Sequence, residues 1–247
     1  MEEGAPTARR TSPSSYEILG QRVTLPCYVR KARALNVVYL VPSSVAATFV
    51  GEALEPVEVE PGQTQLVLGC VDYLDNDLGQ YREVMVVFFV RPRLGGAGTE
   101  GTYIYKLPVD QEFTCVAGRT IWGFPKTIER IHFEVDAQRA RCRLFMDGLP
   151  VFTLATPRAG GVSGSTPETE MLTYTYRPTL HAVPFVSAGE GVEMFPGGDG
   201  VTLELGEHRL ANELRLLGLP SAPLIATWTE HFTGRFGAPV PVSGASS

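Results

Sequence analysis

Near its middle the chain carries the stretch Gly118-Arg119-Thr120-Ile121-Trp122-Gly123-Phe124-Pro125-Lys126, in which a lysine ends a run of aromatic and apolar residues. Lysine is rare here, because the sequence contains three lysines against eighteen arginines. An arginine keeps its charge in proteins, whereas a buried lysine amine can lose its proton and act as a nucleophile. Lys126 is therefore either a reactive amine or a lysine whose stem lies along Trp122 or Phe124 with its charge in solvent.

A glutamate farther upstream is the second candidate. The stretch Gly79-Gln80-Tyr81-Arg82-Glu83-Val84 leads into a long apolar run. A carboxylate at the start of a buried strand is unfavourable unless it is paired or used. Glu83 is thus either a functional carboxylate or half of a structural ion pair at a strand end.

Downstream, Pro125 fixes its own φ and restricts Phe124 to extended backbone, which aims Lys126 in a defined direction.

These two motifs resemble the signatures of the acetoacetate decarboxylase superfamily, Gly-Arg-x-x-Trp-Gly-Phe-Pro-Lys and Tyr-x-Glu. The resemblance covers about residues 22–235. It implies that Lys126 forms a Schiff base with a keto acid or ketone, in a pocket that activates the amine. It also implies that Glu83 faces the same cavity and positions substrate or moves protons. Members of the superfamily are cone-shaped barrels that assemble into homo-oligomers, and we expect the same here.

The resemblance also suggests substrate-binding residues. The family uses an arginine from the early strands for the substrate carboxylate, and a guanidinium suits that task because its planar fork makes two hydrogen bonds. Arg30 and Arg33 compete for this place. Trp122 and Phe124 are expected to form the apolar wall, and Tyr81 accompanies Glu83 in the second motif.

Two positions depart from the family pattern. Decarboxylases proper carry a second lysine directly after the Schiff-base lysine, where this chain has Thr127, and a further acid on the strand that here reads Leu66-Val67-Leu68-Gly69-Cys70. The departures resemble the biosynthetic branch of the family. Three functions stay open: β-keto acid decarboxylation or related C–C bond chemistry, an aldolase–dehydratase or cyclase of natural-product biosynthesis, and a non-catalytic barrel that binds a small molecule.

Composition limits the remaining possibilities. The chain has 247 residues, 44% of them hydrophobic, with a net charge of −6 and a pI near 5.3. An acidic protein of this kind is not expected to bind nucleic acid, and no apolar run reaches the ~18–20 residues of a membrane span. Residues 1–20 lack the apolar segment of a secretion signal, so we expect a cytoplasmic protein with a flexible polar leader.

The cysteines and histidines show no metal-binding spacing. The four cysteines lack a Cys-x-x-Cys pair and the four histidines lack a His-x-x-x-His pair, so we expect reduced, buried thiols, no metal and no cofactor. The motif Gly-x-Gly-x-x-Gly at residues 96–101 is followed by a strand pattern, so it predicts a hairpin loop and not a dinucleotide site.

Hydrophobic periodicity predicts one mainly β (α+β) domain over residues 21–238, a single closed or cone-shaped antiparallel β-barrel with a few short helices, followed by a flexible tail at 239–247. The near-continuous apolar runs at 66–71 and 83–90 indicate strands that are covered on both faces. A short helix is expected after Pro42 with a serine cap, and a longer one at 207–217. Residues 157–170 are rich in Gly, Ser, Thr and Pro and predict an exposed loop.

Overall fold

The computed structural model describes residues 8–93 and 98–242. The strands are β1 (Ala8–Ser12), β2 (Ser15–Ile18), β3 (Gln21–Thr24), β4 (Cys27–Pro42), β5 (Leu54–Pro56), β6 (Glu58–Glu60), β7 (Gln63–Asn76), β8 (Tyr81–Pro92), β9 (Gly101–Val109), β10 (Lys126–Ile128), β11 (Arg130–Val135), β12 (Arg139–Met146), β13 (Leu149–Pro157), β14 (Val162–Arg177), β15 (Thr179–Pro196), β16 (Thr202–Leu205), β17 (Ile225–Phe236) and β18 (Val240–Pro241). The helices are α1 (Ser43–Ala46), α2 (Glu112–Ala117), the π-helical turn η1 (Gly118–Trp122) and α3 (Arg209–Leu216). None of the described helices is long and apolar enough to cross a membrane.

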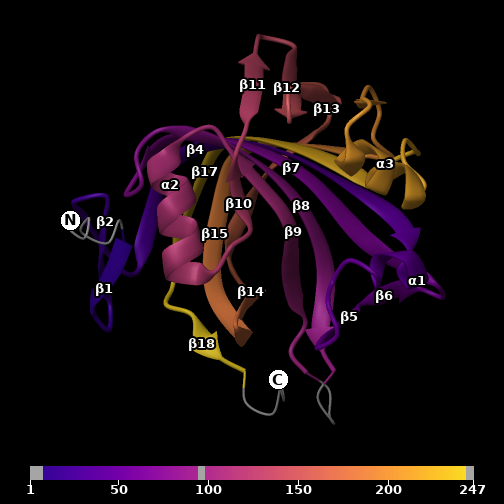
Figure 1. Ribbon diagram of the computed structural model, residues 1–247. Helices are drawn as coiled ribbons and strands as arrows, with labels where there is room; N and C mark the ends of the chain where they lie inside the picture. Colours follow the sequence, from indigo (N-terminus) through magenta and orange to yellow (C-terminus); the bar gives the residue numbers. More distant parts are fainter. Residues whose placement is uncertain (1–7, 94–97, 243–247) are drawn as a thin grey trace.

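Seven strands close into a ring in the order β4, β7, β8, β9, β14, β15 and β17, and β17 pairs back to β4. The ring is cone-like and not evenly round (Figure 1), which confirms the mainly β class and the closed barrel. Its antiparallel character is not complete, because β9 and β14 pair in parallel. A parallel pair needs a long crossover, and here the chain between the two strands forms α2, η1, β10 and three of the four strands of a separate small sheet.

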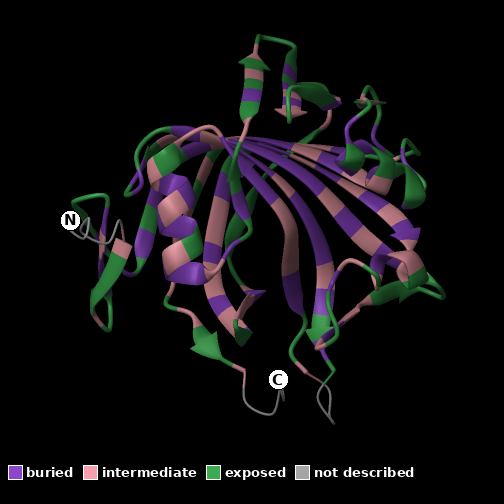
Figure 2. Cartoon of the chain, in the orientation of Figure 1, coloured by how far each residue is buried: buried purple, intermediate pink, exposed green. Residues whose placement is uncertain are grey.

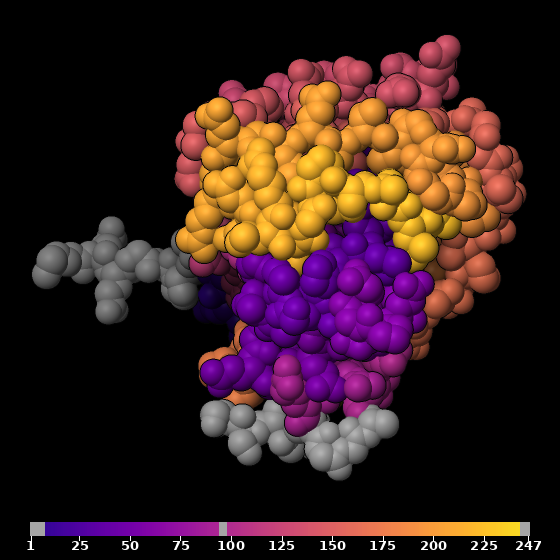
Figure 3. All heavy atoms as spheres, turned by 90° about the vertical axis from the view of Figure 1, so that its right-hand side faces the viewer, coloured from indigo at the N-terminus to yellow at the C-terminus, as the bar shows by residue number. Residues whose placement is uncertain are grey.

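The central strands are buried on both faces, as the apolar runs predicted. Side chains alternate along β8: the odd-numbered residues from Glu83 to Phe89 line a cavity inside the ring, and the even-numbered residues from Val84 to Val90 lie in a core on the outer face. The small sheet β11-β12-β13-β16 and the buried side of α3 contribute to that outer core. Figure 2 shows the resulting bands of buried residues along the strands. Figure 3 shows the C-terminal segment around α3, in orange and yellow, lying against the violet N-terminal strands.

The N-terminal segment differs from the prediction. We expected residues 1–20 to be a flexible leader, but β1 and β2 form a three-stranded sheet with β3, in which β2 pairs with both neighbours. Tyr16 and Ile18 are buried and belong to the core that also contains Trp122 and Phe124. Two apolar side chains, spaced two apart on one strand face, thus tie this segment to the domain. Residues 1–7 lie outside the described ranges, as do residues 243–247 of the expected tail.

Several smaller expectations were also wrong. Residues 162–170, expected to form a loop, are exposed but belong to β14, whose backbone pairs with β15. The polar composition of residues 162–170 indicated that they are exposed to solvent, but it did not indicate that they lack strand structure. The N-cap of α1 is Pro42 without a side-chain hydrogen bond, not a serine. The expected hairpin at 96–101 agrees with the antiparallel pairing of β8 and β9, although residues 94–97 lie outside the described ranges.

Candidate active site

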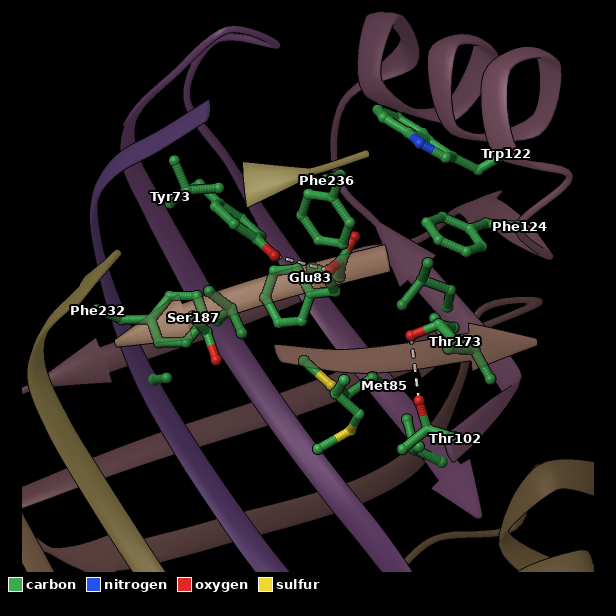
Figure 4. A pocket seen from close by; sticks show the side chains of 18 of the residues that line it. Tyr73, Glu83, Met85, Thr102, Trp122, Phe124, Thr173, Ser187, Phe232 and Phe236 are labelled. Atoms are coloured by element: carbon green, nitrogen blue, oxygen red, sulfur yellow. Dashed lines mark hydrogen bonds between the residues drawn. The ribbon is translucent and has the colours of Figure 1, made fainter. Parts of the chain in front are cut away.

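A cavity of about 260 Å³ lies inside the ring. Most of its walls are aliphatic and aromatic side chains from the ring strands, with Trp122 and Phe124 at one end (Figure 4). The described residues that line it are Cys27, Val29, Ala34, Asn36, Val67, Val71, Tyr73, Asn76, Leu78, Tyr81, Glu83, Met85, Val87, Phe89, Thr102, Ile104, Leu107, Trp122, Phe124, Lys126, Met171, Thr173, Phe185, Ser187, Phe232 and Phe236.

The stretch that carries Lys126 is helical before it is extended. The helix α2 runs directly into η1, which ends at Gly123 in the left-handed conformation with φ of 73°. The chain then becomes β10, which lies parallel to β9 with Lys126 opposite Leu107. No helix was predicted for this stretch, and π-helical turns are frequent at functional sites. The change from helix to strand points the Lys126 side chain into the cavity, where 4% of its surface is exposed.

Contacts from other strands hold this turn in place. The Arg177 guanidinium donates hydrogen bonds to the carbonyl oxygens of Thr120 and Ile121 at 2.9 and 2.5 Å. These carbonyls lie at the end of a helix, where backbone acceptors lack partners within the helix. The Thr175 hydroxyl donates to the carbonyl of Gly123 at 2.9 Å. The end of η1 is therefore fixed by β14.

Glycine at position 118 makes room for the lysine stem. A Cβ atom built at Gly118 would lie 2.6 Å from Cδ of Lys126 and 2.8 Å from its Cε. Real Cβ contacts are never this close, so any larger residue at this position must displace the lysine. The first glycine of the signature therefore has a direct steric role in placing the amine.

The lysine amine lies in a cluster of polar groups. Its Nζ is 2.9 Å from Oε2 of Glu83 and donates a hydrogen bond of 2.8 Å to Oγ1 of Thr114. The Tyr73 hydroxyl donates to Oε1 of Glu83 at 3.0 Å (Figure 4). The ring of Tyr81 stacks on Tyr73 and its centroid is 4.8 Å from Nζ. Amine and carboxylate are thus both buried, in direct contact and each oriented by a hydroxyl.

Burial controls the ionisation of the groups around this pair. Desolvation, reinforced by the nearby charge of Glu83, raises the pKa of Tyr73 and of Tyr81 well above the ordinary value. Both phenols therefore stay protonated and available as donors. Burial and, to a smaller extent, Asp77 raise the pKa of the Cys27 thiol to about 12. A neutral thiol is a poor nucleophile, which leaves the amine as the stronger candidate in the cavity.

Five of the residues singled out from the sequence meet here: Tyr81, Glu83, Trp122, Phe124 and Lys126. The ring centroids of Trp122 and Phe124 are 5.7 Å apart, and Phe236 packs against both. These three rings form the apolar wall that the sequence predicted for two of them. Phe236 comes from the last ring strand, and nothing in the sequence linked it to Lys126.

The two candidate arginines do not reach the cavity. Arg30 pairs with Asp75 and Asp77 at 2.9 and 2.6 Å, and Arg33 lies 3.6 Å from Glu230. The alternation of β4 explains this correction: Val29 and Ala34 line the cavity, and the register shift between them leaves both arginines on the outer side.

Sequence reasoning missed Thr114 and Tyr73. Thr114 lies four residues before Gly118, on the same helical face, but this helix was not predicted. Tyr73 lies beyond the apolar run at 66–71, but β7 continues to Asn76 and places Tyr73 opposite Tyr81. The alternation of Val71 and Tyr73 was the signal that could have extended the strand. Among the described residues, no group of three or more His, Cys, Asp or Glu side chains could hold a metal ion.

Comparison with known proteins gives the family. The family model for acetoacetate decarboxylase (ADC) matches residues 7–240. The chain therefore belongs to the acetoacetate decarboxylase family, a family of lyases. A search of curated proteins found no match.

Solved structures show the same fold at low identity. The acetoacetate decarboxylase of Legionella pneumophila superposes with a TM-score of 0.69 at 15% identity, covering 98% of this chain and 93% of that one. The enduracididine biosynthesis enzyme MppR in complex with pyruvate gives 0.62 at 18% identity, with 90% and 91% covered. An acetoacetate decarboxylase-like enzyme from Sphingomonas wittichii RW1 gives 0.59 at 16%, with 91% and 96% covered.

Proposed function

We propose that this protein is an enzyme that forms a Schiff base between Nζ of Lys126 and a carbonyl substrate, with Glu83 as its acid–base group. One observation carries the proposal: the amine is buried in an apolar cavity, 2.9 Å from a buried carboxylate. A buried ion pair seldom adds stability over well-packed apolar residues. Such a pair at the wall of a cavity is therefore better explained by chemistry than by folding, which argues against a barrel that only binds.

The geometry suits the first step directly. The carboxylate of Glu83 can accept a proton from the Lys126 ammonium, because the two atoms are already at hydrogen-bond distance. The free amine then adds to the substrate carbonyl carbon. The carbonyl oxygen takes up one proton from the amine nitrogen and one from Glu83, which becomes a carboxylate again, and leaves as water. The resulting iminium withdraws electrons from the adjacent bond, which can be a C–C bond or a C–H bond.

Two hydroxyls position the reacting groups. Thr114 accepts from Nζ of Lys126, and Tyr73 donates to the far oxygen of Glu83. These two contacts fix the orientation of the Lys126 amine and of the Glu83 carboxylate. Such pre-oriented groups contribute to rate through geometry alone.

The family supports a small carbonyl compound as the substrate. Homologues bind small keto acids, as the pyruvate complex of MppR shows for that enzyme. For this chain we propose a ketone, aldehyde or keto acid, and C–C bond chemistry of either the decarboxylation or the aldol type.

Reductive trapping tests the proposal. The protein is incubated with acetone, pyruvate or acetoacetate, reduced with borohydride, and measured by intact mass and peptide mapping. We expect an adduct on the Lys126 peptide in the wild type and in Lys31→Ala, whose lysine is exposed, and none in Lys126→Met. Release of CO₂ from acetoacetate would identify a decarboxylase. An adduct that persists in a folded Lys126→Met variant, or no adduct with these three compounds or with a longer ketone such as 2-octanone, would contradict the proposal.

A further inference from the structure

We propose that the substrate of this site is a neutral carbonyl compound with an apolar tail, a ketone or aldehyde and not a keto acid. The inference rests on the proposed Schiff-base role of Lys126 and specifies its substrate class. Three features of the cavity support it: its charge balance, its shape and the pairing of its polar groups.

The charges in the cavity already balance. Of the described residues that line it, Lys126 and Glu83 are the charged ones, and they pair at 2.9 Å. When the amine becomes an iminium, the single positive charge remains opposite the single carboxylate. A substrate carboxylate would add a second negative charge next to Glu83, and burying an unpaired carboxylate is strongly unfavourable.

The guanidinium that could compensate this charge lies elsewhere. Arg30 and Arg33 are held on the outer face of β4 by Asp75, Asp77 and Glu230. None of the described cavity residues is an arginine. The described part of the chain therefore offers a substrate carboxylate no bidentate partner.

The cavity extends away from the reacting pair along an apolar wall. Glu83, Met85, Val87 and Phe89 line it in succession on one face of β8, and Phe89 lies opposite Thr102 of β9. The six steps from Glu83 to Phe89 along the extended strand span about 20 Å, at roughly 3.3 Å per step. A volume of about 260 Å³ corresponds to roughly nine water molecules at about 30 Å³ each. This space suits a molecule that is longer than pyruvate and lies with its carbonyl at Lys126.

Two of the polar groups farther along the cavity pair with each other. The hydroxyls of Thr102 and Thr173 are 3.1 Å apart and hydrogen-bonded (Figure 4). Between them and Glu83 lies Met85, whose flexible thioether adapts to the shape of a neighbouring chain. The paired hydroxyls and the thioether offer no charged partner to the tail of the substrate.

A neutral substrate also determines the reaction. A simple ketone has no carboxylate to lose, so the iminium acts on the C–H bond beside it. The Glu83 carboxylate takes that proton, the C–H electron pair forms a C=C bond, and the C=N π pair returns to nitrogen as a lone pair. The product is an enamine, whose carbon can add to a second carbonyl compound and form a C–C bond. The reverse sequence cleaves such a bond.

Three matched probes test the substrate class: 2-octanone, 2-oxooctanoate with its carboxylate beside the carbonyl, and 7-oxooctanoate with its carboxylate at the far end. Each is titrated in the borohydride reduction, with acetone and pyruvate as short references. We expect 2-octanone to reach half-maximal labelling of Lys126 at a concentration at least tenfold below either acid. In D₂O, we also expect deuterium to enter 2-octanone beside its carbonyl, and this exchange to fall at least tenfold in Glu83→Gln.

A designed variant should shift the substrate preference from the neutral ketone toward the keto acids. Asn36 lines the cavity on β4 and is not fully buried, so Asn36→Arg supplies a guanidinium, and Asn36→Met controls for size. We expect Asn36→Arg to improve labelling by the keto acids relative to 2-octanone, and Asn36→Met to leave the order unchanged.

The outcomes separate this inference from the proposed function. If either acid labels as well as 2-octanone, the inference is wrong while the Schiff base stands. Labelling by acetone without labelling by 2-octanone would also overturn it. If no probe labels Lys126, acetone and pyruvate included, the proposed function fails and the inference fails with it.

Discussion

At the scale of single residues, the cavity contains a buried pair of charged side chains, Lys126 and Glu83, that packing of the core does not require. Lys126 and Glu83 have 4% and 6% of their side-chain surface exposed. Removing one member of such a pair leaves an uncompensated buried charge, whereas replacing both members leaves no unpaired charge in the core. The pair is therefore strongly coupled in stability, whatever its part in catalysis.

This coupling can be measured by a double-mutant cycle. We expect Lys126→Met and Glu83→Gln each to lower the free energy of unfolding by about 3–5 kcal/mol. The double variant is expected to lose much less than the sum of the two. Urea unfolding of the four proteins gives the coupling energy. Additive losses would mean that the two groups do not form a pair in solution.

At the scale of elements, the position of Lys126 depends on the joint between the helical turn η1 and the strand β10. The helix α2 and the turn η1 place Thr114 and Gly118 on the side that faces Lys126. Arg177 and Thr175 of β14 hold the end of η1 through its carbonyls. The position of the amine thus depends on contacts from two regions of the chain more than fifty residues apart.

Adding one methyl group tests this joint. In Gly118→Ala the new Cβ would lie 2.6 Å from Cδ of Lys126, so the lysine stem has to move. We expect the rate of borohydride trapping to fall at least tenfold, since displacements of about 1 Å at a reacting group have effects of this order or larger. The fold is expected to persist, because the obstacle is a flexible side chain.

The matched control is Gly164→Ala on the exposed part of β14. There the nearest atom to a new Cβ is 3.6 Å away, an ordinary contact, and we expect trapping at the wild-type rate. Equal rates in Gly118→Ala and Gly164→Ala would show that the contact between Gly118 and the lysine stem does not position the amine.

At the scale of the whole molecule, the ring of strands is covered outside and encloses the site inside. All four cysteines are buried and unpaired, as the sequence predicted. Burial raises the pKa of Cys27 to about 12 and that of Cys70 well above its ordinary value. The native thiols of Cys27 and Cys70 are therefore protonated, and all four thiols are inaccessible, so their reactivity reports opening of the fold.

Thiol labelling tests this view of the fold. At pH 8 we expect iodoacetamide to label the native protein at the slow rate of unfolding, and all four cysteines at once in denaturant. The sign of the pH effect follows from the raised pKa. In the unfolded chain Cys27 loses its proton near pH 9, but in the native protein only near pH 12. Stability should therefore fall as the pH rises across this interval. Rapid native labelling at pH 8 would contradict this account.

The sequence by itself determined much of this protein because some of its signals are local. Alternation and apolar runs gave the strands, the two-sided burial of β8 and the mainly β class. The rarity of lysine and the unfavourable position of Glu83 singled out the two residues that form the buried pair. The signature motifs added the family, which the comparison confirmed.

Tertiary structure alone decided which side chains meet. A register shift in β4 places both Arg30 and Arg33 on the outer face, and no local sequence pattern predicts such a shift. A continuous strand brought Tyr73 to Glu83, and an unpredicted helix brought Thr114 to Lys126. The reason is physical: periodicity fixes the face of a strand only within one register, whereas the composition of a cavity depends on how seven strands close around it.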